Sequence, residues 1–189
     1  MVTFIVLLTT NSYEREKSNQ ITYEDNKKNI DVSILKEPYI LDFLGLKLNY
    51  KEKDLEQSII DNMSKFLLEL GKGYSYVARQ KALKIDNKTY YVDLVFYNSI
   101  LRCYVLIDLK INELKHNALS QMDLYCNYFD ENIKSKEENK TIGLILVKEN
   151  NEIVIKYSSL LKDKSIYVSI YKDYLPSKEE ILKIIKKKN

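Results

Sequence analysis

The chain has 189 residues, of which 45% are hydrophobic. That length allows one well-buried core and is too short for two ordinary domains. Lys and Arg number 30 against 27 Asp and Glu, and a net charge of +3 neither indicates nor excludes a nucleic-acid partner.

Several classes of function are disfavoured by composition. Only four glycines occur, and none forms a phosphate-binding loop pattern, which argues against ATPases and dehydrogenases. The single histidine, His116, argues against a histidine-rich zinc site and a histidine-based nucleophile system. Cys103 and Cys126 lie far apart in apolar stretches, which predicts reduced core thiols and a cytoplasmic location. The apolar opening, residues 1–8, is far too short to span a bilayer, so no membrane partner is expected.

The first elements along the chain are an arm and a helix. Residues 11–29 are polar and aperiodic, so residues 1–38 are predicted to be an N-terminal arm and residues 39–189 the folded domain. Apolar residues recur at helical spacing from Asp54 to Leu70, and Gly71 supplies a stop, which predicts one long helix.

The remaining elements alternate between strands and helices. Apolar runs predict strands over 74–83, 89–97 and 101–111, followed by a helix over 117–132. Further strands are expected over 141–147, 153–157 and 166–171. A last helix is expected to open at Pro176 and Ser177 and to close on the terminal lysines. This order predicts an α/β fold.

Two carboxylates and one lysine interrupt the second and third strands. Asp93 lies in the run 91–96, and Asp108 and Lys110 lie in the run 104–110. An acid in a buried strand is costly unless a partner offsets it, and residues two apart share a strand face. The turn at Asn98 and Ser99 predicts an antiparallel hairpin in which the three side chains converge.

This set suits phosphodiester hydrolysis. Carboxylate oxygens hold Mg²⁺ or Mn²⁺, which neutralises the phosphate and activates water, and a lysine can orient that water. In the alternative interpretation, Asp93 and Asp108 end their strands and Lys110 merely forms an ion pair.

Four further residues are candidates from position alone. Glu56 shares a helical face with apolar residues, although a glutamate in a first helical turn also simply favours the dipole. Gln121, on the helix after the Asp108 strand, could hold a phosphate oxygen or occupy the surface. Arg79 and Gln80 could face a substrate groove or form a rim pair.

Several segments together resemble a known family. Leu67 to Tyr74, Arg79-Gln80, Tyr91 to Tyr97, Leu109-Lys110 and Ser120 to Met122 are similar to the C-terminal domain of the YhcG-like family, within the PD-(D/E)XK nuclease superfamily. The similarity covers about residues 39–171. It implies a restriction-endonuclease-like core, in which a mixed four-stranded sheet is flanked by helices.

The resemblance also implies roles for named residues. Asp93 and Asp108 match the two metal-binding acids, Lys110 the catalytic lysine, Gln121 the glutamine of the next helix, and Glu56 the helix carboxylate. The backbone carbonyl of Leu109 would be a further metal ligand. Asp108 stands where the family usually has glutamate, which could shift metal preference.

The expected function is therefore that of a Mg²⁺-dependent endonuclease acting on DNA, with Mn²⁺ as an alternative ion. The alternative is a non-catalytic nucleic-acid-binding or assembly module that keeps the fold. Family members usually carry an N-terminal helical domain, so residues 1–38 are interpreted as an arm or the remnant of that domain in a truncated product. A homo-oligomer or a second protein could supply DNA recognition.

Overall fold

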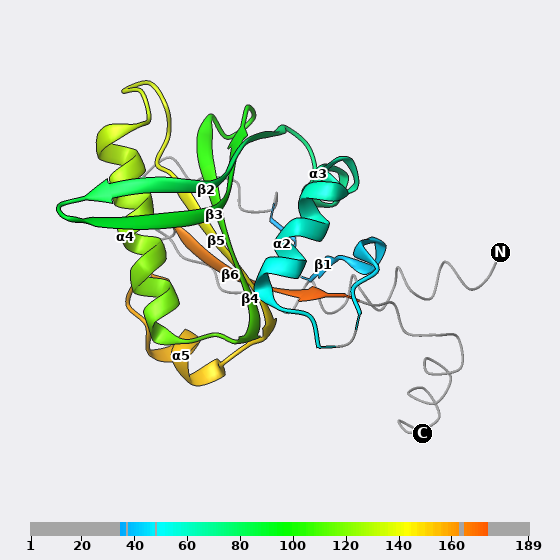
Figure 1. Ribbon diagram of the computed structural model, residues 1–189. Helices are drawn as coiled ribbons and strands as arrows, with labels where there is room; N and C mark the ends of the chain where they lie inside the picture. Colours follow the sequence, from blue (N-terminus) through cyan, green and yellow to red (C-terminus); the bar gives the residue numbers. More distant parts are fainter. Residues whose placement is uncertain (1–34, 37, 48, 163–164, 174–189) are drawn as a thin grey trace, which may run out of the picture. The chain divides into compact units, whose positions relative to one another are not determined.

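The computed structural model describes residues 35–36, 38–47, 49–162 and 165–173 (Figure 1). The elements in chain order are β1 (Tyr39–Ile40), η2 (Asp42–Leu44), α2 (Glu52–Asp61), α3 (Met63–Leu70), β2 (Tyr74–Ile85), β3 (Lys88–Asn98), β4 (Cys103–Glu113), α4 (His116–Asn132), β5 (Ile142–Glu149), α5 (Glu152–Tyr157) and β6 (Ile166–Lys172). No helix within these ranges is both long and apolar enough to cross a membrane.

One mixed sheet organises the described part of the chain. Its strand order is β1-β6-β5-β4-β3-β2. The pairs β2·β3 and β3·β4 are antiparallel, and β4·β5, β5·β6 and β1·β6 are parallel. The α/β class is confirmed. The sheet has six strands where the family resemblance implied four, and β1 and β2 are the strands at its two ends.

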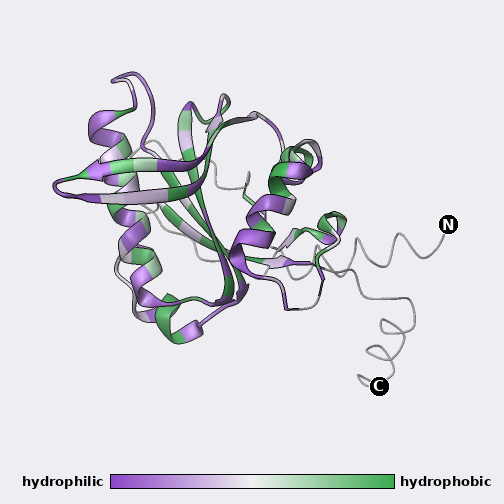
Figure 2. Cartoon of the chain, viewed as in Figure 1, coloured by the Kyte–Doolittle hydropathy of each residue, from purple (hydrophilic) through white to green (hydrophobic). Residues whose placement is uncertain are grey.

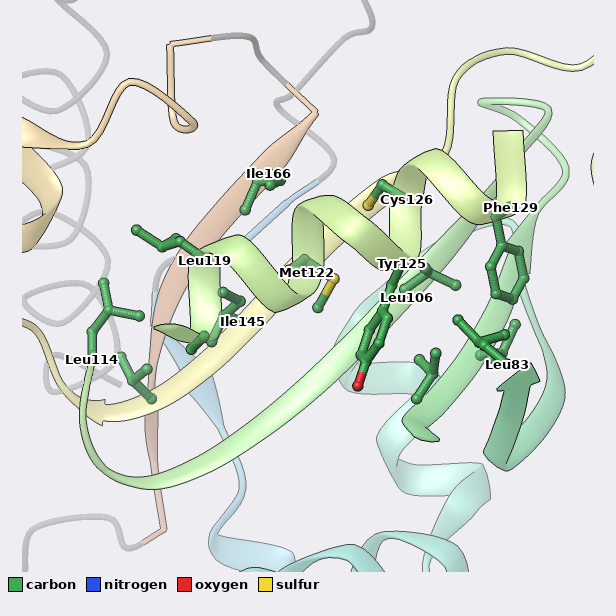
Figure 3. Packing of buried hydrophobic residues seen from close by; sticks show 14 residues of the cluster. Leu83, Leu106, Leu114, Leu119, Met122, Tyr125, Cys126, Phe129, Ile145 and Ile166 are labelled. Carbon is green, nitrogen blue, oxygen red and sulfur yellow. The ribbon is translucent and has the colours of Figure 1, made fainter. Parts of the chain in front are cut away.

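Helices pack against both faces of the sheet. On one face, α4 covers β4 and β5, and its residues Met122, Tyr125 and Phe129 lie in a core cluster with Leu106 and Ile145 (Figure 3). On the other face, Phe66 of α3 packs on Phe96 of β3, with ring centroids 5.9 Å apart. Since adjacent strand residues point to opposite faces, these two layers follow from the alternation of Val95 and Phe96. Figure 2 shows the green, apolar sides of the helices turned toward the sheet.

Several sequence predictions are confirmed with small shifts of their ends. The strands β2, β3, β4, β5 and β6 and the helix α4 lie where periodicity placed them. Cys103 and Cys126 are buried free thiols, and burial raises the pKa of Cys103 to about 12. The predicted arm, the apolar opening and the terminal helix lie outside the described residues, so the domain boundaries stay a prediction.

Two predicted elements were wrong. The single helix over 54–70 is two helices, broken at Asn62, whose φ of −115° and ψ of 30° leave the helical region and whose amide nitrogen donates to the Ser58 carbonyl. The strand over 153–157 is the helix α5, because the Asn151 side chain accepts a hydrogen bond from the Val154 N–H and caps it. Side-chain capping outweighs the β-propensity of Ile153 and Val154 here.

Gly143 allows α4 to approach β5 closely. A methyl group at this position would collide with Met122 Cγ and lie 2.7 Å from Met122 Sδ and 3.0 Å from Cys126 Sγ. We expect Gly143→Ala to lower the free energy of unfolding by about 2 kcal/mol, because overpacking forces core side chains off their rotamers. Urea denaturation measures this loss.

A second substitution identifies the cause of that loss. In the Gly143→Ala background, Met122→Ala opens the space that the new methyl group needs. The double variant should therefore lose clearly less free energy of unfolding than the sum of the losses in the two single variants. Strict additivity would show that the collision with Met122 is not responsible.

Asp173 connects the end of β6 to two other segments. Tyr50 Oη donates to Asp173 Oδ2 at 2.7 Å, and Lys148 Nζ lies 2.8 Å from the same oxygen. Partial burial acts to raise the pKa of Asp173, but the hydrogen bonds from Lys148 and Tyr50 outweigh it and lower that pKa below its ordinary value.

This contact predicts a pH-dependent stability. A lowered folded-state pKa contributes stability that is complete above the unfolded pKa of about 3.9 and is lost as the pH falls through the folded value. We expect Asp173→Asn to lower the free energy of unfolding by about 1 kcal/mol at neutral pH, a modest effect because solvent screens the pair. The difference from wild type should vanish in acid, and the exposed Asp42→Asn should show no such effect at either pH.

Candidate active site

Three polar residues form one row across the sheet. The β2·β3 pairs Arg79↔Leu94 and Lys81↔Val92 flank Gln80 and place it opposite Asp93. The β3·β4 ladder runs from Asn98↔Cys103 to Leu94↔Ile107, so the next step places Asp93 opposite Asp108. Cross-strand neighbours share a face, and two like charges in that position destabilise a sheet unless another group separates or neutralises them.

The β3·β4 ladder ends where the two acids meet. Beyond Ile107, β4 continues to pair with β5 but no longer with β3. The N–H of Leu109 donates to Asp93 Oδ2 at 2.9 Å in place of a β3 carbonyl. The Asp93 carboxylate is thereby fixed in the opening between the strands.

Gln80 links two of the acids. Its Nε2 donates to Glu56 Oε2 at 2.8 Å and to Asp93 Oδ1 at 3.1 Å. The backbone of Gln80 is left-handed, with φ of 45°, which is unusual for a residue with a β-carbon. The carboxylates of α2 and β3 therefore converge on one amide nitrogen.

Glu56 extends from the helix layer to the row. Its side chain is half-buried on α2. Burial raises the pKa of Glu56, the Gln80 amide acts against that rise, and the charge of Asp93 adds to it. A carboxylate in this position binds a proton or a cation more readily than one in open solvent.

Asp108 and Lys110 form the other half of the site. Asp108 is only 5% exposed, and its Oδ2 lies 2.8 Å from Lys110 Nζ. Burial raises the pKa of Asp108 to about 7, with Lys110 lowering it and Asp93 raising it. Burial acts to lower the pKa of Lys110, but the Asp108 carboxylate outweighs it and raises that pKa above its ordinary value.

Gln121 approaches the row through a tyrosine. Its Nε2 lies 2.5 Å from Tyr125 Oη, and that hydroxyl donates to the Tyr91 carbonyl at 3.0 Å. Figure 3 shows the Tyr125 ring descending from α4, with its oxygen directed away from the apolar cluster. Among the described residues Gln121 has this bond and none to Lys110, so its role as a catalytic group stays a prediction.

Tyr125 was missed as a site residue. No role in the site was predicted for it from the sequence. Burial raises the pKa of its hydroxyl, and the charges of Asp108 and Asp93 contribute. The available signal was its spacing of four residues from Gln121, which places both side chains on one helix face.

The two proposed substrate contacts differ in position. Arg79 is exposed, its Nη1 donates to Gln57 Oε1 on α2 at 3.1 Å, and its charge acts to lower the pKa of Glu56. Gln80, in contrast, lies within the row. His116 is the exposed first residue of α4.

The donor set suits a hard divalent cation. The oxygens of Glu56 and Asp93 converge on Gln80, and Asp108 Oδ2, apart from its ion pair with Lys110, has no hydrogen-bond partner in the part of the chain that the structure describes. Oxygen-only ligands are what Mg²⁺ and Mn²⁺ prefer. Within the described ranges no three His, Cys, Asp or Glu side chains are close enough to hold a metal as they stand. The Gln80 amide occupies the point on which the oxygens of Glu56 and Asp93 converge, so an ion bound by both would require it to move aside.

A solvent-filled depression adjoins Lys110. Its volume is about 200 Å³, and it is lined by residues of α2, β4 and α4: Glu52, Lys110, Asn112, Glu113, Lys115, Asn117 and Ala118. Charges of both signs meet there. The Lys110 ammonium thus has an open approach beside the buried Asp108.

Comparison with protein families gives one match that spans most of the chain. The model described as the YhcG PDDEXK nuclease domain matches residues 32–186. The protein YhcG of Escherichia coli (strain K12) is 35% identical over 147 residues, which are 78% of this chain and 39% of that protein. The chain therefore spans about two fifths of the length of that relative.

Solved structures give weaker likenesses. A complex of EndoMS with double-stranded DNA has a TM-score of 0.49 at 17% identity and covers 69% of this chain and 48% of the other. A repair endonuclease from Pyrococcus abyssi has a TM-score of 0.42 at 19% identity, with coverages of 69% and 50%.

The bridging amide of Gln80 makes a testable contribution to stability. In the metal-free protein, Gln80→Ala leaves the carboxylates of Glu56 and Asp93 facing each other without a donor. We expect a loss of about 1 kcal/mol in the free energy of unfolding. Glu56→Ala in the same background should recover part of it, giving a coupling of about 0.5 kcal/mol or more in a double-mutant cycle. Independent losses would show that the bridge has no energetic role.

Proposed function

The chain belongs to the YhcG PDDEXK nuclease domain family, and on that premise we propose that it is a divalent-metal-dependent endonuclease that hydrolyses phosphodiester bonds in DNA. The observation that carries this proposal is the meeting of Asp93, Asp108 and Lys110 where β3 and β4 separate. A buried acid, Asp108, next to a half-buried one, Asp93, and a lysine is costly for the fold and useful for chemistry on a phosphate.

The acids are the proposed metal ligands. Asp93 and Asp108 would hold Mg²⁺ or Mn²⁺ from neighbouring strands, with Glu56 approaching from α2 and the carbonyl of Leu109 as a further donor. When bound, such an ion neutralises charge on the scissile phosphate and lowers the pKa of water. The Leu109 N–H keeps the Asp93 carboxylate in orientation through its hydrogen bond of 2.9 Å.

Lys110 is the proposed partner of the nucleophile. Its ammonium lies 2.8 Å from Asp108 and borders the open depression. From there it can orient the attacking water and stabilise negative charge that develops on the phosphate oxygens. Gln121, held by Tyr125, would orient a phosphate oxygen or Lys110 itself.

A non-catalytic DNA-binding module of the same fold is the second candidate. One observation favours it: the amide of Gln80 occupies the point where the oxygens of Glu56 and Asp93 converge. If Gln80 stays there, the site cannot gather three acids around one ion. The two candidates therefore differ in whether the protein binds Mn²⁺ through these acids.

Substitutions of Asp108, a proposed metal ligand, and of Lys110 distinguish metal binding from DNA cleavage. We expect Asp108→Asn to abolish both calorimetric Mn²⁺ binding and DNA cleavage. Lys110→Met should lower the cleavage rate by about 100-fold or more while Mn²⁺ affinity changes little, because Lys110 acts in the transition state and is not a ligand. Removal of the metal with EDTA should stop cleavage by the wild-type protein.

Matched controls are available on the surface. Asp42→Asn and Lys65→Met change the same residue types at exposed positions of η2 and α3 and should leave binding and cleavage at wild-type values. Mn²⁺ binding that survives Asp108→Asn, with no cleavage by the wild type, would favour the binding module. Cleavage that survives Lys110→Met would contradict the role of Lys110.

A further inference from the structure

One face of the β2–β3 hairpin is exposed beside the site. The hairpin pairs Ala82↔Tyr91 and Lys84↔Thr89. Paired residues and residues two apart in a strand share a face, so these four side chains lie together. All four are exposed, whereas Leu83, on the opposite face, is fully buried in the cluster with α4. We call this set, Ala82, Lys84, Thr89 and Tyr91, the outer hairpin face.

Tyr91 is an aromatic side chain that is more than half exposed. It is 53% exposed, and its ring has no aromatic or cation partner among the described residues. Exposing an aromatic ring forgoes burial that would stabilise the fold. Other large exposed side chains exist, such as Tyr157 at 75% and Leu68 at 80%, but among them Tyr91 alone lies two residues from an acid of the site.

The position of Tyr91 is fixed relative to that acid. Two residues along a strand correspond to about 7 Å. The Tyr91 carbonyl accepts the hydrogen bond from Tyr125, and Asp93 is held by the Leu109 N–H. Small neighbours leave the ring open, because Ala82 is its cross-strand partner. A flat, anchored and accessible ring therefore stands next to the proposed metal ligands.

The outer hairpin face carries one cation, Lys84. Lys81 and Lys88 are also exposed on the hairpin, but their cross-strand partners Val92 and Ile85 pack toward the cluster under α4, and Asp86 adds one negative charge at the turn. Figure 2 shows the hydrophilic colouring of the hairpin end. A lysine beside an exposed aromatic ring suits single-stranded nucleic acid, in which a phosphate meets the cation and an unpaired base stacks on the ring.

We infer that the outer hairpin face binds single-stranded DNA, with Tyr91 stacking on an unpaired base beside the scissile phosphate and Lys84 contacting the backbone. This inference rests on the proposed nuclease function and adds the substrate class, DNA that is single-stranded or locally unpaired. In duplex DNA each base is stacked between its neighbours, so Tyr91 could stack on a base only after that base is unstacked. Tyr91 should therefore contribute less to the binding of duplex DNA.

The absence of tryptophan from the chain gives a direct test. In Tyr91→Trp the introduced indole is the single tryptophan, and its fluorescence should be quenched when a single-stranded oligo-dT is added in EDTA, where no cleavage occurs. Tyr157→Trp places the same fluorophore at an exposed position of α5 and should not be quenched.

Affinity measurements complete the test. Tyr91→Ala should weaken oligo-dT binding by about tenfold or more, Tyr91→Phe should retain it, and duplex binding should change less. Lys84→Ala should reduce the slope of log affinity against log salt by about 0.7, whereas Lys65→Ala on α3 should not. Circular dichroism of each variant verifies folding.

The failure of this inference can be told from failure of the nuclease proposal. Single-strand binding that is absent, or unchanged in Tyr91→Ala, overturns the inference even if metal-dependent cleavage is observed. Single-strand binding that depends on Tyr91, without Mn²⁺ binding or cleavage, supports DNA binding by the outer hairpin face and contradicts the proposed nuclease activity. Equal losses on single strands and duplexes in Tyr91→Ala would also overturn the proposed substrate class.

Discussion

The separation of β3 from β4 after the Leu94↔Ile107 pair is the constraint on which the site depends. A continued ladder would bring the half-buried carboxylate of Asp93 directly against the buried carboxylate of Asp108, and two like charges in that position destabilise a sheet. Separation releases the Leu109 N–H, which binds Asp93, and leaves Asp108 to pair with Lys110. One break in the ladder thus supplies an oriented acid, a buried acid and an ammonium, and the helices on both faces hold that break in place.

Much of this arrangement could be predicted from sequence because it depends on strand periodicity. Asp93, Asp108 and Lys110 interrupt apolar runs, and alternation places Asp108 and Lys110 on one face. The convergence of Asp93 and Asp108 was predicted from the hairpin, but their direct opposition was not, because the β3·β4 register depends on the geometry of the turn that follows Asn98. Strict alternation would place Val92 and Val95 on opposite faces of β3. Both instead lie in the core cluster under α4, and this departure from alternation occurs next to Gln80, whose backbone is left-handed.

Local chemistry explains the elements that periodicity missed. Asn62 and Asn151 each use a side-chain hydrogen bond to redirect the backbone, and neither effect appears in an apolar pattern. Gln80 was considered only as a substrate contact, and its bridge between Glu56 and Asp93 became visible once α2 and β2 were placed side by side. A single sequence gives the residue types, but it does not show which residues far apart in the chain lie side by side.

The irregular backbone of β2 also bears on solubility. Among the described strands β2 is at one edge of the sheet, and it is 12 residues long, which would ordinarily offer a template for aggregation with other chains. A bulge between Tyr76 and Ala78, the left-handed Gln80 and the charged Lys81 and Lys84 interrupt that template in close succession. Gln80, which joins two acids, therefore also helps to keep the open edge of β2 from pairing with a strand of another chain. Regularising β2 by design would favour fibrillar or amorphous precipitation.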